Sequence, residues 1–348
     1  MMLRCCHSKS PRQSLLFVLL VLLLLLPTTS SLWIGDGTVT TEIKRCSTRL
    51  SDSIASKGDS VKTSDLFSLD SIRSTLIRQE ETIIFSLIER AQYRRNFDIY
   101  NPKKLNLENV YGSPLSFLEW MLIETEKLHS KVRRYTSPEE HPFFGPLLPP
   151  PVIDELDFPD LLGVDKDEVN VNPEVLRWYV EKIIRQLCNS GDDEQHGSTV
   201  LCDINALQAL SRRVHLGKFV AESKYLQSPE EYNRMVQAGD VMGILKMLTN
   251  KEVERGVIRR AFLKASQYGK DITSPPAPSA AAAAVTAPDP PKNSSFAAMF
   301  RSVDMKMEGY KVDPMLIADI YRDMIIPLTK DVEVRYLFRR CGKSCFVV

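Results

Sequence analysis

Two cations in one segment of the chain have the spacing of a binding site for a small dianion. Helical periodicity runs over residues 203–225, and Arg213 and Lys224 stand eleven residues apart within it. At about 100° per residue, eleven steps return to within about 20° of the starting direction, so both side chains point the same way, about 16 Å apart. Gly217 lies between them and leaves room for another group to approach the backbone. The alternative is that both cations are ordinary solvated side chains at a helix border.

Further polar pairs at helical spacing accompany these cations. Asn250 and Glu254 are four residues apart, as are Thr329 and Glu333, and Arg73 flanks the apolar stripe of the first helix. Side chains four residues apart share one face of a helix. The pattern predicts one polar cavity inside a helical bundle. Its candidate lining residues are Arg73, Arg213, Lys224, Asn250, Glu254, Thr329 and Glu333.

The motifs of several other chemistries are missing from the sequence. There is no serine or cysteine nucleophile motif, no glycine-rich phosphate loop and no pair of histidines. His215 lies between two apolar residues without an obvious acidic partner, and we interpret it as structural. The cysteines beyond residue 31 show neither CxxC spacing nor a nearby histidine at zinc-ligand spacing. We therefore expect neither a metal nor a cofactor.

The elements that would position these side chains are all predicted to be helices. Apolar residues repeat at three, four and seven positions, and no strand or hairpin signal is present. The proline-rich stretch 141–159 is expected to be extended or looped, and a kink is expected at Pro327. The predicted fold class is all-α. The predicted helices cover residues 69–91, 115–134, 173–187, 203–225, 228–249, 252–268 and 313–340.

The first 31 residues differ in kind from the rest. Three basic residues precede an apolar run over residues 15–26, and small residues follow it. This layout is typical of a signal peptide and predicts the secretory pathway or the extracellular space. The alternative to a signal peptide is a plastid transit peptide, and the alternative compartments are the plastid and the cytosol. Twelve apolar residues are too few for a relaxed membrane-spanning helix, which needs about 20, so we expect no stable span once the leader is removed.

Composition divides the remaining chain. With 45 basic and 44 acidic residues the charges nearly cancel, so nothing points to a nucleic-acid partner. Residues 32–64 read as a flexible lead-in, 65–340 as one domain and 341–348 as a tail. Within the domain, residues 274–295 are a Pro/Ala-rich linker, which holds a glycosylation sequon at Asn293.

Six segments, in colinear order over residues 66–340, resemble eukaryotic chorismate mutases and are most similar to those of plants. The segments are LDSIR at 69–73, IRQEETIIFSLIER at 77–90, SPEEHPFF at 137–144, LQALSRR at 207–213, GKFVAE at 217–222 and PLTKDVE at 327–333. The resemblance implies a homodimer of all-α subunits, each with an active site inside a helical bundle. It also implies rearrangement of chorismate to prephenate without a metal or cofactor.

The resemblance implies a role for each candidate residue. Arg73 and Arg213 would clamp the substrate carboxylates, and Thr329 would help to hold one of them. Lys224 and Glu333 would meet the ether oxygen of the breaking C–O bond. The ring hydroxyl would donate to Glu254, and Asn250 would support the set. An arginine fork suits a carboxylate, and one ammonium suits an ether oxygen, so these residue types fit the chemistry.

The resemblance also implies an effector site at the dimer interface, which would bind tyrosine or tryptophan. Arg133 and Arg134 match its outline, together with Gly197 and Ser198. The alternative for the two arginines is a helix C-terminus, which favours cations. Two other functions remain open: a catalytically silent helical protein that binds aromatic amino acids, and a secreted mutase that acts on another organism's chorismate.

Overall fold

The computed structural model describes residues 69–104, 114–154, 156, 161–270 and 309–342. The chain divides into two compact units, Met1–Asp52 and Ser53–Val348, and every described residue lies in the second. Within these residues the secondary structure is helical apart from one isolated bridge, between Lys270 and Tyr310. This confirms the predicted all-α class. The leader, the lead-in, the linker with Asn293 and residues 343–348 lie outside the described residues.

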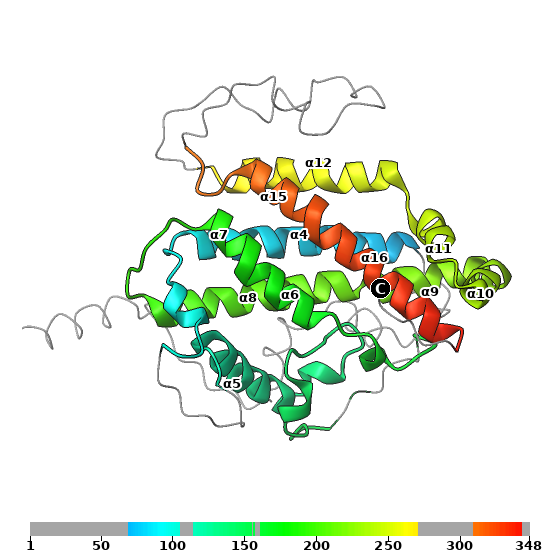
Figure 1. The fold of residues 1–348 in the computed structure, drawn as a ribbon, viewed down its shortest axis with the longest axis horizontal. Helices are drawn as coiled ribbons and strands as arrows, with labels where there is room; N and C mark the ends of the chain where they lie inside the picture. The colour runs from blue at the N-terminus through cyan, green and yellow to red at the C-terminus, as the bar shows by residue number, and fades with distance from the viewer. Residues whose placement is uncertain (1–68, 105–113, 155, 157–160, 271–308, 343–348) are drawn as a thin grey trace, which may run out of the picture. The chain divides into compact units, whose positions relative to one another are not determined.

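Three long helices pack together in the described unit. α4 (Leu69–Ala91) lies along α8 (His196–His215), and α12 (Lys251–Tyr268) packs against α4 (Figure 1). Apolar residues three and four apart place one face of each helix in the core, as the periodicity predicted. The buried core includes Ile83, Leu87, Leu207, Leu210 and Phe262.

The segment predicted as one helix over 203–225 is longer and is interrupted. α8 begins at His196, and a turn at Leu216 separates it from α9 (Gly217–Gln227). The predicted start was wrong because Asp203, a residue type that favours helix N-caps, is instead buried in α8 and pairs with Arg90 at 2.6 Å. At the turn, the Leu216 amide still donates to the Arg212 carbonyl at 3.1 Å, so the chain continues in nearly the same direction.

The segment predicted as one helix over 228–249 is two helices. α10 (Pro229–Ala238) ends at Gly239, whose φ of 71° is left-handed, and α11 (Val241–Leu248) follows. Glycine is the usual residue for this helix-ending conformation. Asp240 then caps α11 by accepting from the Gly243 amide at 2.8 Å.

Two predicted helices contain a wider π turn. The first consists of α6 (Asn172–Trp178), a π segment (Tyr179–Ile183) and α7 (Ile184–Leu187). The second consists of α15 (Pro314–Ile320), a π segment (Tyr321–Ile325) and α16 (Ile326–Arg340). In the second, the irregularity expected at Pro327 takes the form of the π turn just before it. Proline has no amide hydrogen and interrupts α-helical hydrogen bonding, which a π turn can absorb.

Shorter elements surround these helices. α5 (Phe117–Lys131) is shorter than predicted, and a capping box fixes its start: the Glu119 amide donates to Ser116 Oγ, while the Ser116 amide donates to the Glu119 carboxylate. Between residues 141 and 159, the only helical turn among the described residues is Gly145–Leu147.

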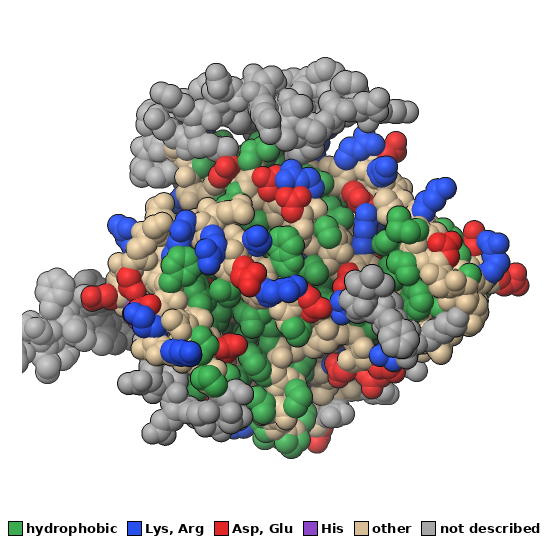
Figure 2. Space-filling view, in the orientation of Figure 1, with side chains coloured by type: hydrophobic (Ala, Val, Ile, Leu, Met, Phe, Trp, Pro, Cys, Tyr) green, Lys and Arg blue, Asp and Glu red, His purple; other side chains and the backbone are tan. Residues whose placement is uncertain are grey.

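Contacts between helices assemble the region of the candidate site. α9 packs along α16, α4 touches α9, and α12 packs on α15 (Figure 1). On the face shown in Figure 2, Lys and Arg side chains are interspersed with Asp and Glu, and neither sign dominates. No helix in the described part of the chain is long and apolar enough to span a membrane.

Candidate active site

α9 and α16 approach each other closely at Gly217. A Cβ atom built on Gly217 would lie 2.9 Å from the carbonyl oxygen of Thr329 and 3.4 Å from Cγ of Glu333. The first distance is too short for a real Cβ atom, so the residue must be glycine or the helices must separate. This confirms the prediction that Gly217 admits another group to its backbone. The group is α16, which carries two of the candidate residues.

Lys224 and Glu333 face each other across the two helices. Lys224 Nζ lies 3.8 Å from Glu333 Oε2 and donates to the carbonyl oxygen of Leu248 at 2.6 Å. The Glu333 side chain is nearly buried, whereas that of Lys224 is about one quarter exposed. The ammonium therefore has one close protein partner and remains able to donate to a ligand.

Burial controls the ionisation of Glu333. Removal from water raises the pKa of Glu333 to about 7, although the positive charges of Lys224, Lys330 and Arg213 act in the opposite direction. Burial and a neighbouring cation act in opposite directions on the pKa of a carboxyl group. Burial dominates, and Glu333 is therefore a carboxylic acid below about pH 7 and can donate a hydrogen bond.

Arg213 is a buried cation with free hydrogen-bonding capacity. The residue is 5% exposed, and its Nε and Nη1 atoms have no hydrogen-bond partner. Burial lowers the pKa of the guanidinium, and Tyr321, Glu80 and Glu333 offset part of this effect. An arginine side chain stays protonated even so. Buried N–H groups without a partner cost free energy, so the geometry suits a ligand carboxylate that would complete the site.

Thr329 lies in the first turn of α16, directly after the π segment. Its hydroxyl is buried and donates to the Ile325 carbonyl oxygen at 2.6 Å. The hydroxyl oxygen can still accept a hydrogen bond. To donate to a carboxylate, the hydroxyl must rotate away from Ile325.

Asn250 and Glu254 lie at the start of α12. The Asn250 side-chain oxygen caps the helix by accepting from the amides of Glu252, at 3.1 Å, and Val253, at 3.2 Å. Its amide nitrogen remains available. Glu254 pairs with Lys330 of α16 at 2.7 Å and contributes to the electrostatic environment of Glu333.

Arg73 stands apart from these contacts. It is in the first turns of α4, its side chain is 51% exposed, and Nη1 pairs with Asp70 at 3.0 Å. No contact within the described residues joins Arg73 to the other candidates. The structure thus links Arg213, Lys224 and Glu254 to Glu333 through contacts or electrostatics. Thr329 lies one helical turn before Glu333, and Asn250 lies one turn before Glu254.

Sequence reasoning missed three residues beside Arg213. Arg260 of α12 donates to both carboxylate oxygens of Glu80, at 2.7 and 2.9 Å. Tyr321 in the π segment has a buried hydroxyl without a hydrogen-bond partner. One signal was available: Glu80 precedes Ile83 by three residues and Leu87 by seven, which puts a carboxylate on the core face of α4.

The four candidate effector residues do not meet within one chain. Arg134 Nη1 donates to Gln208 of α8 at 2.8 Å, and Arg133 Nη1 donates to the Asp154 carbonyl at 2.5 Å. Gly197 and Ser198 lie in the first turn of α8. Ten residues of helix separate Ser198 from Gln208, which corresponds to about 15 Å. Arg134 also pairs with Glu140 at 3.3 Å.

No metal-binding arrangement is found in the described part of the chain. There, no group of three or more His, Cys, Asp or Glu side chains is placed to hold an ion. His215 is buried and has two backbone partners: its Nδ1 lies 2.8 Å from the Ser211 carbonyl oxygen, and its Nε2 accepts from the Val171 amide at 3.0 Å. These bonds agree with the structural interpretation of this histidine.

Comparison with known proteins identifies the family. Residues 197–334 match the family model described as chorismate mutase type II. Chorismate mutase 1, chloroplastic, of Petunia hybrida is 40% identical over 280 residues, which are 80% of this chain and 78% of the relative.

Solved structures give the same result. The chorismate mutase Aro7p of Candida albicans, in complex with L-Trp, aligns with a TM-score of 0.68 and 37% identity over 83% of this chain and 97% of that one. AtCM1 with tyrosine bound in its allosteric site aligns with a TM-score of 0.63 and 38% identity over 80% of this chain and 98% of that one. The chain belongs to the chorismate mutase family.

Proposed function

We propose that this protein is an isomerase that rearranges chorismate to prephenate in aromatic amino acid biosynthesis. The observation that carries this function is the buried guanidinium of Arg213, which has two nitrogen atoms without partners, in the electrostatic field of the Lys224–Glu333 contact. Chorismate carries two carboxylates and an ether oxygen. These are the groups that an arginine fork and a lysine ammonium recognise.

Binding would fix the reactive shape of the substrate. An intramolecular [3,3] rearrangement requires the two ends of the molecule to be held together, and no proton transfer or nucleophile is needed. We assign carboxylate binding to Arg213, with Thr329 as a second donor once its hydroxyl leaves Ile325. Arg73 would clamp the other carboxylate. To do so, its side chain must leave Asp70 and pair with the substrate instead.

The breaking C–O bond would lie between Lys224 and Glu333. Negative charge grows on the ether oxygen in the transition state, and donors already in place stabilise it. Lys224 donates through its ammonium, and Glu333 donates while protonated. Glu254 would accept from the ring hydroxyl, and the free amide nitrogen of Asn250 would support the set.

Loss of chorismate absorbance, measured with purified residues 32–348, tests this function. We expect turnover without added metal or cofactor, with prephenate as the product. A folded, helical protein that leaves chorismate unchanged between about pH 5 and 9 would contradict the proposal. Binding of tyrosine or tryptophan by that inactive protein would instead favour the silent binding protein.

We propose further that the effector residues form a site between two copies of the chain. Arg134 contacts α8 at Gln208, about 15 Å along the helix from Ser198, so one ligand contacting all four residues would need residues from both subunits. Tyrosine and tryptophan in the two solved relatives support the class of ligand. Sedimentation should give a dimer, and Ser198→Tyr should remove any effect of either amino acid on turnover while leaving basal turnover intact. A monomer would contradict this proposal.

We propose that residues 1–31 are a cleavable targeting segment. The unbroken apolar run favours the secretory pathway, whereas the name of the petunia relative favours a plastid. The full chain with a fluorescent tag at its C-terminus should be shortened at its N-terminus. A shift in mass at Asn293 would mark the secretory route, and import by isolated plastids would mark the other. An uncleaved, cytosolic product would contradict the proposal.

A further inference from the structure

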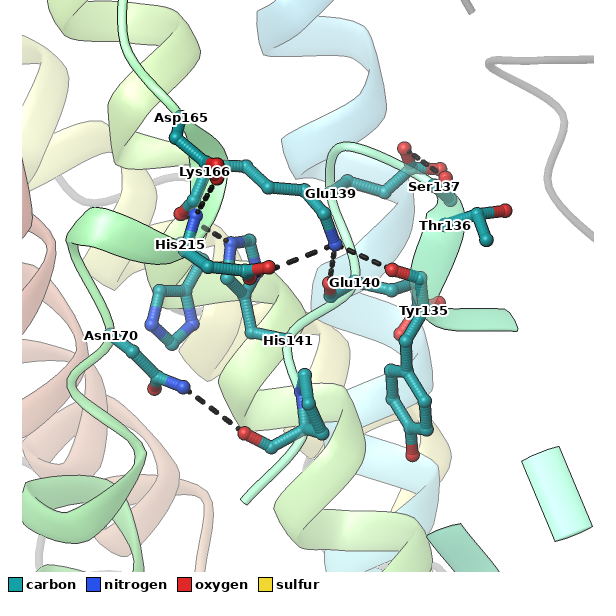
Figure 3. Close-up of polar contacts among 12 residues, drawn as sticks. Tyr135, Thr136, Ser137, Glu139, Glu140, His141, Asp165, Lys166, Asn170 and His215 are labelled. Carbon is teal, nitrogen blue, oxygen red and sulfur yellow. Dashed lines mark hydrogen bonds and ion pairs between the residues drawn. The ribbon is translucent and has the colours of Figure 1, made fainter. Parts of the chain in front are cut away.

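A second buried polar cluster lies at the start of α9, on the chain segment that follows Arg213. Lys218 is 1% exposed, and its Nζ lies 2.6 Å from Nε2 of His141. The rings of His141 and His215 stack, with centroids 4.2 Å apart (Figure 3). Within the described residues no carboxylate forms an ion pair with Lys218. A buried lysine without an anionic partner favours its neutral form.

The hydrogen bonds of His215 fix its protonation. Its Nε2 accepts from the Val171 amide at 3.0 Å, so Nε2 carries no proton. Its Nδ1 lies 2.8 Å from the Ser211 carbonyl oxygen, so the proton is on Nδ1. His215 is therefore neutral and keeps one tautomer. Burial also lowers the pKa of His215 to about 3.

The partners of His141 favour one tautomer when Lys218 is neutral. Nε2 lies 3.2 Å from the carbonyl oxygen of Lys166, whereas Nδ1 is buried and has no partner. A proton on Nε2 finds an acceptor, but a proton on Nδ1 would be a buried donor without one. With the proton on Nε2, His141 donates toward either the Lys166 carbonyl or a neutral Lys218 amine.

Protonation of Lys218 reverses this arrangement. The Lys218 ammonium has only donors to present, so His141 Nε2 must become an acceptor and its proton must move to Nδ1. One proton enters from solvent, and one proton changes nitrogen within the ring. The cost is an N–H group at Nδ1 that has no acceptor. Burial lowers the pKa of Lys218 to about 7, with Lys166 acting in the same direction and Asp165 and Asp167 in the other.

We propose that Lys218 and His141 form a buried proton switch, which takes up one proton as the pH falls through neutrality and loosens the first turn of α9 from the segment 137–144. The charged and titratable groups around the switch come from three places: the segment 137–144, the turn Lys166–Glu168 with its N-cap Asp165, and α8. They are Glu139, His141, Asp165, Lys166, Asp167 and His215.

The switch lies next to the contact that holds the candidate active site. Lys218 follows Gly217, whose backbone touches Thr329 of α16. Movement of this first turn would shift α9, and Lys224 with it, relative to Glu333. The proton uptake itself is a property of the folded chain and does not depend on the proposed activity.

Unfolding midpoints of Lys218→Met across about pH 6 to 10 test the switch. In the unfolded chain a lysine stays protonated to about pH 10.4, so wild-type stability should rise with pH between about 7 and 10 as the folded protein sheds this proton. Lys218→Met should be more stable than wild type at pH 6, and the difference should shrink steadily toward pH 10. Lys131→Met, at an exposed lysine of α5, is the control and should run parallel to wild type. A constant difference between Lys218→Met and wild type would overturn the proposal.

A spectroscopic measurement on the unaltered protein decides the matter if Lys218→Met does not fold. Nitrogen shifts of ¹⁵N-labelled histidines report which ring nitrogen carries the proton. We expect His141 to change from the Nε2–H to the Nδ1–H tautomer as the pH falls through about 7, while His215 keeps Nδ1–H throughout. A His141 ring with one tautomer from about pH 5.5 to 9 would overturn the switch.

Discussion

Two buried cations lie five residues apart, on either side of the junction between α8 and α9, and their surroundings differ. Arg213 has N–H groups without partners, whereas Lys218 faces a histidine nitrogen and a backbone carbonyl. An arginine cannot release its proton at ordinary pH, so a buried one needs an anion. A buried lysine can become neutral instead. Of the two residues, the unpartnered arginine is therefore the candidate for binding an anionic ligand.

The largest expected effect comes from removing the unpartnered arginine. Arg213→Ala should lower chorismate turnover at least about 100-fold, because the substrate loses a preorganised donor pair. Its helical circular dichroism should be unchanged, and its free energy of unfolding should not fall, since a desolvated cation without a partner is removed. Lys218→Met at pH 8 is the matched variant and should keep its turnover. Near-normal turnover by Arg213→Ala would remove Arg213 from the site.

The next effect sharpens the role of Glu333. Its raised pKa means that the folded protein holds this proton up to about pH 7, so the hydrogen-bond donor is present below pH 7 and is lost above it. Wild-type turnover should therefore fall about tenfold per pH unit above about pH 7. Glu333→Gln keeps a donor at every pH, so its profile should be flatter, with a lower maximum. Initial rates from about pH 5 to 9 provide the measurement. The same alkaline decline in both proteins would mean that another group titrates.

The raised pKa of Glu333 also affects stability, with a defined sign. Between its ordinary value and about 7, the folded protein holds a proton that the unfolded chain has released, so this group lowers the free energy of unfolding as the pH rises. Glu333→Gln should lose this contribution and gain stability relative to wild type at pH 8. Any buried acid with a raised pKa makes the free energy of unfolding fall as the pH rises. Lys218 has the opposite effect, because its lowered pKa makes the free energy of unfolding rise with pH.

The smallest expected effect separates two roles of Asn250. Asn250→Ala should lose about 1 kcal/mol of stability, because the cap of α12 is removed. Asn250→Asp keeps an oxygen that can cap the helix but loses the side-chain amide donor. It should keep most of the stability and lose turnover. Chemical denaturation and chorismate assays on both variants would distinguish the roles, and equal turnover in Asn250→Asp and wild type would leave Asn250 with the capping role alone.

The helices were predictable where a local pattern decides them. The bounds of α4 follow from apolar residues at helical spacing, and the close approach at Gly217 follows from a missing side chain on that face. The start of α8 was not predictable in this way. Asp203 has the residue type of a cap, but its partner Arg90 lies 113 residues earlier in the sequence, and only the folded chain brings them together.

The candidate site was predictable in its residue types and only partly in its contacts. Spacing placed Thr329 and Glu333 on one face of a helix. It could not show that Arg260 forms an ion pair with Glu80, because 180 residues separate them in the sequence. The ionisation of Glu333 likewise depends on burial, which spacing does not give. Lys218 was part of a family-like segment in the sequence, yet its pairing with His141 depends on a loop 77 residues away.

Binding of prephenate is the most direct test of the claim that Arg213 binds an anionic ligand and Lys218 does not. A ligand that binds only the folded protein raises its unfolding temperature, and the rise grows with the logarithm of the ligand concentration above the dissociation constant. At pH 8, increasing prephenate should raise the unfolding temperature of the wild type and of Lys218→Met alike, and it should leave that of Arg213→Ala unchanged. A rise in Arg213→Ala equal to that of the wild type would contradict the account.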